Sequence, residues 1–327
     1  MPGDRMISTP IALGLWAALC LSAAFYGNWS GYGARPFAFT LGAFAILLAG
    51  ELCLAAPGIT QGLTRTSGPQ GGTLLALWPL GAYLLYAVGT GSLAAGGWGA
   101  LAMGYALVPL LLAASAHKAK AGAWQDYVTM AFIFLPYKLG WLSRAFPRGA
   151  FPLARVLPLL FAVNVALATF LFVRGLEGIG YSMGWREGWA GAAALSFFGI
   201  AVVDIPLGMA LHFLHLAPAT SRWTGLPLTL LGTFVLTAWP EEFLFRGLLQ
   251  NCLRRTFRGE NAGWIAAALI FGVSHIANGP FPNWRYAVLA SVAGLGYGWA
   301  WKKTGSIFPG AVVHAFVDVT WHFFFPA

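Results

Sequence analysis

The chain has 327 residues, of which 58% are hydrophobic and only 9% are charged, and its mean hydropathy is +0.70. An ordinary soluble domain has about 25% charged residues, so this composition excludes a soluble globular protein and is typical of a polytopic membrane protein. The 19 Lys and Arg residues give a net charge of +9, but they are spread through the connecting segments rather than gathered in one patch, which argues against a nucleic-acid partner.

Eleven apolar runs along the chain approach the length of a membrane crossing, which takes roughly 20 residues as a helix. They cover residues 9–27, 36–57, 73–95, 98–116, 127–142, 150–173, 189–214, 227–250, 262–279, 286–301 and 306–325. Connections rich in Gly, Pro and Arg separate these runs, and the sequence has no fixed-period repeat. Because several runs are short, we predict an all-α fold class, a polytopic transmembrane helix bundle of about 8–11 spans.

The Lys and Arg residues of the loops indicate how the chain is oriented. When all eleven runs span the membrane, more of these residues fall on the N-terminal side than on the other side, which predicts a cytoplasmic N-terminus. Arg5 and the apolar stretch from Pro10 to Ala24 also fit a secretory signal, but an uncleaved first helix is the preferred interpretation. The composition, rich in Ala, Gly and Trp, favours a bacterial chain, so we expect a multi-pass protein of the cell (inner or cytoplasmic) membrane.

Five acidic residues lie inside the predicted spans, where an ionised side chain costs about 2.5–3.5 kcal/mol at the helix centre. They are Glu51, Asp204, Glu241, Glu242 and Asp318. Acidic residues in such places are functional hypotheses by default. Glu51 and Asp204 belong to no motif, and a structural role and a place on the substrate path are equally open for them.

Two of these carboxylates occur in residues 239–247, which read Trp-Pro-Glu-Glu-Phe-Leu-Phe-Arg-Gly. Glu242 and Arg246 are four apart on one helical face, so we expect an ion pair that organises the helix. Glu241 points about 100° away and lacks that partner, which makes it the candidate general base. Pro240 has no backbone N–H, so a kink or helix start is expected beside the glutamates.

The last two motifs each contain a histidine at helical spacing. Phe271 precedes His275 by four residues, and His314 precedes Asp318 by four. We predict that Glu241 and His275 hold a water molecule that attacks a scissile carbonyl. His314 is the candidate donor to the oxyanion, and Asp318 would orient His314 by accepting its second N–H. An ionised Asp318 could not itself donate to an oxyanion.

The order Glu-Glu-x-x-x-Arg, Phe-x-x-x-His and His-x-x-x-Asp resembles the CAAX protease and bacteriocin-processing (CPBP) family, which includes the Ras-converting CAAX endoprotease. The residues that carry the resemblance are Glu241, Glu242 and Arg246, then Phe271 and His275, then His314 and Asp318. It covers about residues 226–327 and implies an intramembrane glutamate-type protease whose final His and Asp or Asn form the oxyanion site. Asp318 stands where the well-studied CAAX enzymes have asparagine.

The resemblance implies a division of the chain and an activity. Residues 1–188 would be accessory N-terminal transmembrane helices, and residues 189–327 a catalytic transmembrane core with the active site between the C-terminal helices. The expected function is that of an intramembrane endopeptidase in protein maturation or sorting, including the myxosortase-like branch. Its partners would be the lipid bilayer and a membrane-associated or C-terminally anchored protein or peptide. The expected catalytic residues are Glu241, His275, His314 and Asp318, supported by Glu242, Arg246 and Phe271.

Two alternatives remain open. In the first, Glu241, His275 and His314 bind zinc with water as the fourth ligand. We place it below the version without any cofactor, because the sequence has no H-E-x-x-H helix. In the second, the chain is a non-enzymatic membrane protein, such as an immunity factor or a transporter. No inverted repeat supports it, and transport does not need two histidines facing a glutamate pair.

Overall fold

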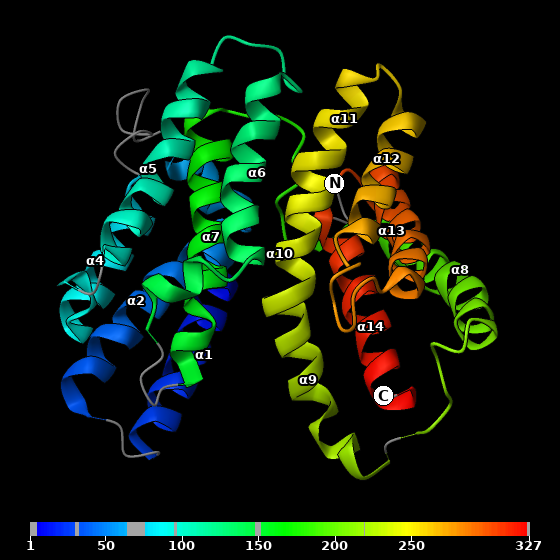
Figure 1. Ribbon diagram of the computed structural model, residues 1–327, viewed down its shortest axis with the longest axis horizontal. Helices are drawn as coiled ribbons and strands as arrows, with labels where there is room; N and C mark the ends of the chain where they lie inside the picture. The colour runs from blue at the N-terminus through cyan, green and yellow to red at the C-terminus, as the bar shows by residue number, and fades with distance from the viewer. Residues whose placement is uncertain are drawn as a thin grey trace. The chain divides into compact units, whose positions relative to one another are not determined.

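The structure is a computed structural model that describes residues 5–29, 33–63, 76–94, 97–147, 152–218 and 220–325. The chain divides into two compact units, one formed by Met6–Glu177 and the other by Gly178–Ala327 with the first five residues (Figure 1). Helices occur in every one of the eleven predicted apolar runs, which confirms the all-α fold class. The beginnings of two runs, 73–95 and 150–173, lie outside the described residues.

Five of the described helices are long and apolar enough to cross a membrane, judged by length and composition. They are Thr9–Asn28, Ala34–Cys53, Trp98–Ser115, Trp189–Ala210 and Ile307–Phe324. Two shorter apolar helical segments are Leu157–Val173 and Glu260–Val273. The protein is therefore a multi-pass membrane protein, while the total of about 8–11 spans stays a prediction.

The N-terminal unit is a bundle in which α2 packs against α1, α4 and α7. Its helices are α1 (Thr9–Trp29), α2 (Ala34–Cys53), α4 (Trp78–Thr90), α5 (Trp98–Ser115), α6 (Trp124–Lys138) and α7 (Leu157–Leu167), which continues as the π-helical segment η4 (Ala168–Val173). Short 3₁₀ turns are η1 (Ser92–Ala94), η2 (Leu142–Ala145) and η3 (Pro152–Arg155). The strand β1 (Arg5–Met6) begins at a residue that groups with the C-terminal unit, and its pairing with β2 (Gly184–Trp185) is a small exception to the helical fold.

Two buried polar clusters in the N-terminal unit are satisfied inside the bundle. The Asn164 amide donates to the carbonyls of Leu47 and Leu160, at 2.9 and 2.7 Å, and accepts from the indole N–H of Trp78 at 2.7 Å. The Arg174 guanidinium donates to the buried Asp126 carboxylate at 2.7 Å. Lipid tails are as apolar as the helix surfaces, so burial of apolar side chains does not by itself favour contact between helices. Hydrogen bonds and ion pairs such as these therefore help to hold the helices together.

The C-terminal unit begins at Gly178, and its first segment packs against the rest of that unit. The division into accessory helices over residues 1–188 and a catalytic core over residues 189–327 stays a prediction. The indole N–H of Trp239 donates to the Tyr181 hydroxyl at 2.8 Å, and their ring centroids are 5.2 Å apart.

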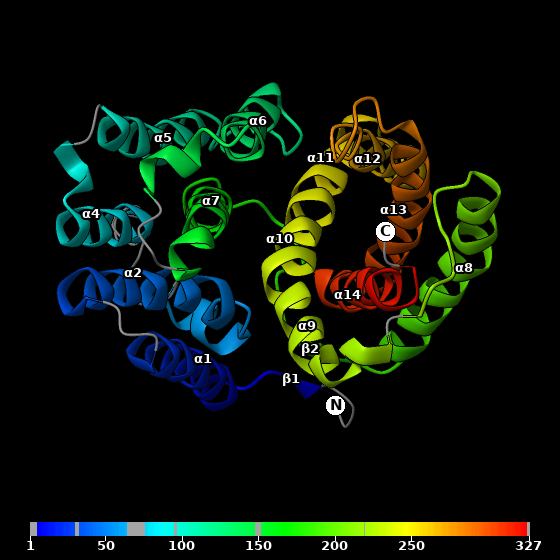
Figure 2. The same cartoon turned by 60° about the horizontal axis from the view of Figure 1, so that its bottom comes forward.

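The C-terminal unit encloses its last helix. Its elements are β2, α8 (Trp189–Ala210), η5 (Thr220–Gly225), α9 (Leu226–Thr233), η6 (Phe234–Ala238), α10 (Trp239–Glu242), η7 (Phe243–Gln250), α11 (Asn251–Thr256), α12 (Glu260–Val273), α13 (Trp284–Thr304) and α14 (Ile307–Phe324). Figure 2 shows α14 with α8, α9, α10 and α13 around it, and α14 contacts each of these helices. The side chains of α14 are therefore placed where several helices meet.

The turn that delivers α14 into this position has strong local signals. Helix α13 ends at Gly305, whose φ of 68° is the left-handed conformation that suits glycine at a helix C-terminus. Ser306 then caps α14, because its hydroxyl accepts a hydrogen bond from the backbone N–H of Phe308 at 3.2 Å. The sequence Gly-Ser thus ends one helix and begins the next.

The helix that carries the two glutamates is irregular on both sides of them. The π-helical segments η6 and η7 flank the single α-helical turn α10, and Pro240 lies in that turn. π-Helical turns often occur at functional sites, because they rotate side chains relative to a regular helix. The sequence predicted a kink or helix start beside Pro240, whereas the structure has a continuous helix with π-helical segments on either side of that turn.

Candidate active site

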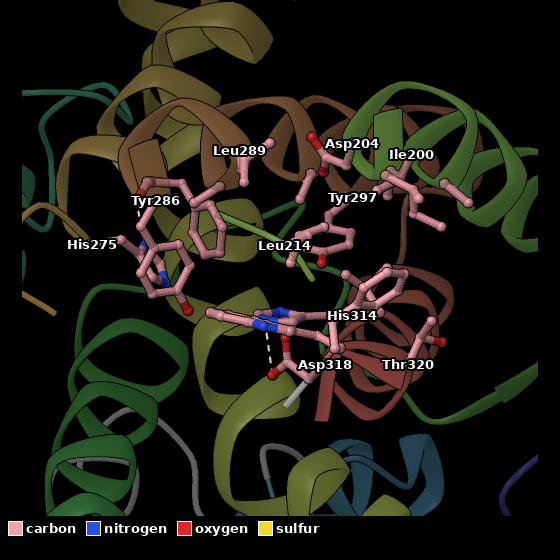
Figure 3. A pocket seen from close by; sticks show the side chains of 18 of the residues that line it. Ile200, Asp204, Leu214, His275, Tyr286, Leu289, Tyr297, His314, Asp318 and Thr320 are labelled. Carbon is pink, nitrogen blue, oxygen red and sulfur yellow. Dashed lines mark hydrogen bonds and ion pairs between the residues drawn. The ribbon is translucent and has the colours of Figure 1, made fainter. Parts of the chain in front are cut away.

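The four predicted catalytic side chains line one cavity of the C-terminal unit, which has about 1010 Å³ of empty volume including its open part. They are Glu241 from α10, His275 from the turn after α12, and His314 and Asp318 from α14 (Figure 3). Three segments that are distant in the sequence therefore contribute to a single site. Most of the remaining lining is apolar or aromatic, which suits a hydrophobic substrate segment.

Glu242 and Arg246 form the ion pair expected from their spacing. Arg246 Nε lies 3.1 Å from Glu242 Oε2, and the two side chains are 1% and 0% exposed. The guanidinium also donates to the Gly294 carbonyl at 3.2 Å and lies 4.6 Å from the ring centroid of Phe271. A buried carboxylate requires a charged or hydrogen-bonding partner, and Arg246 is such a partner for Glu242.

His314 lies between three carboxylates. Its Nδ1 is 3.1 Å from Glu242 Oε1, and since a carboxylate accepts, the ring donates this hydrogen bond. Its Nε2 lies 3.9 Å from Glu241 Oε2 and 3.7 Å from Asp318 Oδ2. The ring is only 3% exposed and stacks on Tyr297, with centroids 4.5 Å apart and an angle of 12° between the planes.

The residue that orients His314 differs from the expectation. We expected Asp318 to accept the second N–H, but its 3.7 Å distance from Nε2 is longer than a hydrogen bond, whereas Glu242 is within range of Nδ1. The reason is geometric, since α10 packs directly against α14 and places the Glu242 carboxylate beside the ring. Glu242 thus links Arg246 to His314, in addition to organising its own helix.

His275 lies beyond the end of its helix rather than within it. Helix α12 ends at Val273, whereas the apolar run continued to residue 279. The His275 Nδ1 donates to the Phe271 carbonyl at 2.8 Å, because a carbonyl can only accept. With the proton on Nδ1, Nε2 is the ring nitrogen that carries a lone pair and can accept a hydrogen bond.

Phe271 packs between the polar groups of the site. It is 2% exposed, and its ring centroid lies 4.7 Å from that of His275, 5.7 Å from that of His314 and 4.9 Å from that of Phe245. Together with the guanidinium of Arg246, these contacts make Phe271 a spacer that holds both histidines in place.

Two tyrosines and one aspartate are among the lining residues that belong to none of the sequence motifs. Tyr297 stacks on His314, Tyr286 lies 4.9 Å from His275 between ring centroids, and Asp204 reaches the cavity from α8. Their only signal in the sequence is a polar group inside an apolar run. That signal identified Asp204 as unusual but could not connect it to the other motifs, because α8 precedes them by more than one helix.

The site combines two carboxylates at the cavity surface, two histidines and a buried ion pair. The Glu241 side chain is 32% exposed and the Asp318 side chain 31%, so both carboxylates reach the cavity, whereas Glu242 is fully buried. In the described part of the chain, no three His, Cys, Asp or Glu side chains are grouped as a metal site would require. The arrangement is suited to proton transfer to and from a bound molecule.

The protein is a multi-pass helical protein, and carboxylates and histidines line a cavity among its C-terminal helices. These features are typical of a polytopic membrane hydrolase. Residues 223–320 match the family model described as Type II CAAX prenyl endopeptidase Rce1-like, which is a family of proteases. The match confirms the resemblance inferred from the motifs and includes all seven residues named for the site. No curated protein and no solved structure matches the chain.

Proposed function

We propose that the chain is a glutamate-type intramembrane endopeptidase. Its substrate would be a membrane-associated or C-terminally anchored protein or peptide, and the cleavage would serve protein maturation or sorting in the cell membrane. The observation that carries this proposal is the convergence of Glu241, His275, His314 and Asp318 on one largely apolar cavity. The family match supports a protease in this region.

In the proposed reaction, a water molecule is held by the Glu241 carboxylate and the Nε2 lone pair of His275. Glu241 takes a proton as the water oxygen bonds to the scissile carbonyl carbon. The carbonyl oxygen becomes negative in the tetrahedral intermediate, and the doubly protonated ring of His314 donates to it from Nε2. Glu242 accepts from Nδ1 and keeps this ring in place, at 3.1 Å.

The intermediate then collapses. The carbon–nitrogen bond breaks, and the proton held by Glu241 passes to the leaving amine, so Glu241 regains its starting form. The products are a carboxyl and an amino terminus. Asp318, whose carboxylate lies 3.7 Å from Nε2 of His314, favours the positive charge on that ring.

The two compact units would have different roles. The C-terminal unit contains every residue of the proposed reaction, so it is proposed as the catalytic core. None of the described residues of the N-terminal unit lines the cavity, and this unit is proposed as accessory. A sorting substrate of the myxosortase-like branch would present a C-terminal membrane anchor, which fits an apolar cavity.

The proposal is tested by comparing the termini of membrane proteins in native cells that carry either the wild-type chain or Glu241→Gln at equal abundance. We expect one class of uncut precursors to accumulate in the variant, because an amide cannot take the proton from water. Mass spectrometry of the termini would identify the substrate at the same time. Unchanged termini, together with rescue of the deletion phenotype by the variant, would replace proteolysis with binding or transport.

The proposed reaction uses no metal. Cleavage by the purified chain is therefore expected to continue at an unchanged rate after treatment with a strong chelator and gel filtration. Loss of cleavage that added zinc restores would instead support the alternative in which Glu241, His275 and His314 bind the ion.

A further inference from the structure

The wall of the cavity formed by α8 is apolar except for one carboxyl group. The α8 residues that line the cavity are Phe197, Ile200, Ala201, Asp204 and Ile205. Figure 3 shows Asp204 on α8, apart from His314 and Asp318 on α14. Helix α8 also lies outside the residues that match the protease family, so Asp204 is a feature of this chain beyond the matched region.

The Asp204 carboxyl group has an oxygen that no protein group satisfies. Its Oδ1 is buried and has no hydrogen-bond partner among the residues that the structure describes. Buried polar atoms in folded proteins nearly always have a partner. The protein thus supplies too few donors for this carboxyl group, and the Asp204 side chain lines the cavity, so Asp204 is suited to bind a hydrogen-bond donor that a ligand brings.

The charges of the cavity lining favour one kind of donor. Three carboxyl groups, from Asp204, Glu241 and Asp318, outnumber the two histidines, His275 and His314, and no Lys or Arg of the described residues lines the cavity. The chain as a whole has the opposite balance, with 19 Lys and Arg against 10 Asp and Glu. Complementary charge selects partners and rejects like charges, so the cavity favours a cationic donor over a neutral one and disfavours an anion.

From these observations we infer that Asp204 forms a specificity subsite for a basic side chain, Lys or Arg, of the substrate segment beside the scissile bond. The inference rests on the proposed function, because Asp204 shares its cavity with Glu241 and His275. Hydrophobic residues of the same segment would contact the apolar part of the α8 wall. Asp204 would thus select which membrane-associated segments are cut, without taking part in proton transfer.

The test uses the purified full-length chain in proteoliposomes with a randomised library of hydrophobic peptides, and mass spectrometry to locate every cleaved bond. For the wild type we expect Lys and Arg to be enriched over Gln about tenfold at one position near the cut, as expected for a charge pair in a site of low polarity. Asp204→Asn should lose this enrichment, because the amide keeps the size of the side chain and removes its charge. Asp204→Glu should retain it.

Glu187→Gln is the matched control, because Glu187 is exposed just before α8 and its substitution removes the same charge outside the cavity. It should keep the enrichment. Glu241-dependent cleavage without a basic preference, or an equal preference in Asp204→Asn, would overturn the subsite and leave the protease intact. Absence of any Glu241-dependent cleavage would overturn the proposed function and the subsite together.

Discussion

Purified protein that carries Glu241→Gln is expected to cut its substrate about 10²–10⁴ times more slowly than the wild type, which is the usual contribution of a positioned general base. Glutamine has nearly the same shape, so it preserves the contacts of the side chain but cannot take a proton from water. The measurement is the initial cleavage rate of the full-length chain in proteoliposomes, with the precursor identified from the membrane-protein termini as substrate.

The control for this loss is Glu260→Gln. Glu260 is 52% exposed and pairs with Arg254 at 2.7 Å, outside the cavity, so its substitution should leave the cleavage rate unchanged. Unfolding midpoints of both variants in detergent should match that of the wild type. A Glu241→Gln rate within tenfold of the wild-type rate would remove Glu241 from the role of general base.

Arg246→Met is expected to lower the free energy of unfolding by about 3–5 kcal/mol, the effect of removing one partner of a buried ion pair. The Glu242 carboxylate is 0% exposed and would lose the guanidinium 3.1 Å from it. Methionine fills much of the volume between Phe271 and Tyr297, so the loss should come mainly from the Glu242 carboxylate, which keeps the hydrogen bond from His314 but loses its cationic partner Arg246. Denaturant unfolding in detergent, followed by tryptophan fluorescence, measures it.

Two further variants separate charge from packing. Arg254→Met breaks an exposed ion pair, whose partners are 27% and 52% exposed, and should change the free energy of unfolding by less than about 1 kcal/mol. Combining Arg246→Met with Glu242→Gln removes both charges and should recover part of the lost stability. If the double variant is as unstable as Arg246→Met alone, packing rather than charge explains the loss.

The sequence by itself determined where the helices lie and the ion pair within one of them. Each predicted apolar run contains a helix. A helix is expected there because a segment that crosses lipid must satisfy its own backbone hydrogen bonds. A spacing of four residues predicted the ion pair between Glu242 and Arg246, because residues so spaced share one helical face. The three motifs likewise indicated the family that the comparison confirmed.

Only the tertiary structure decided which groups face each other across helices. The acceptor for His314 is Glu242 rather than Asp318, Tyr297 stacks on that histidine, and Asp204 belongs to the same cavity. Such contacts depend on how each helix is rotated about its axis and where its regular turns are interrupted, as in the π-helical segments beside α10. Periodicity along one segment carries no information about that rotation relative to the neighbouring helices, because it is set by packing between them.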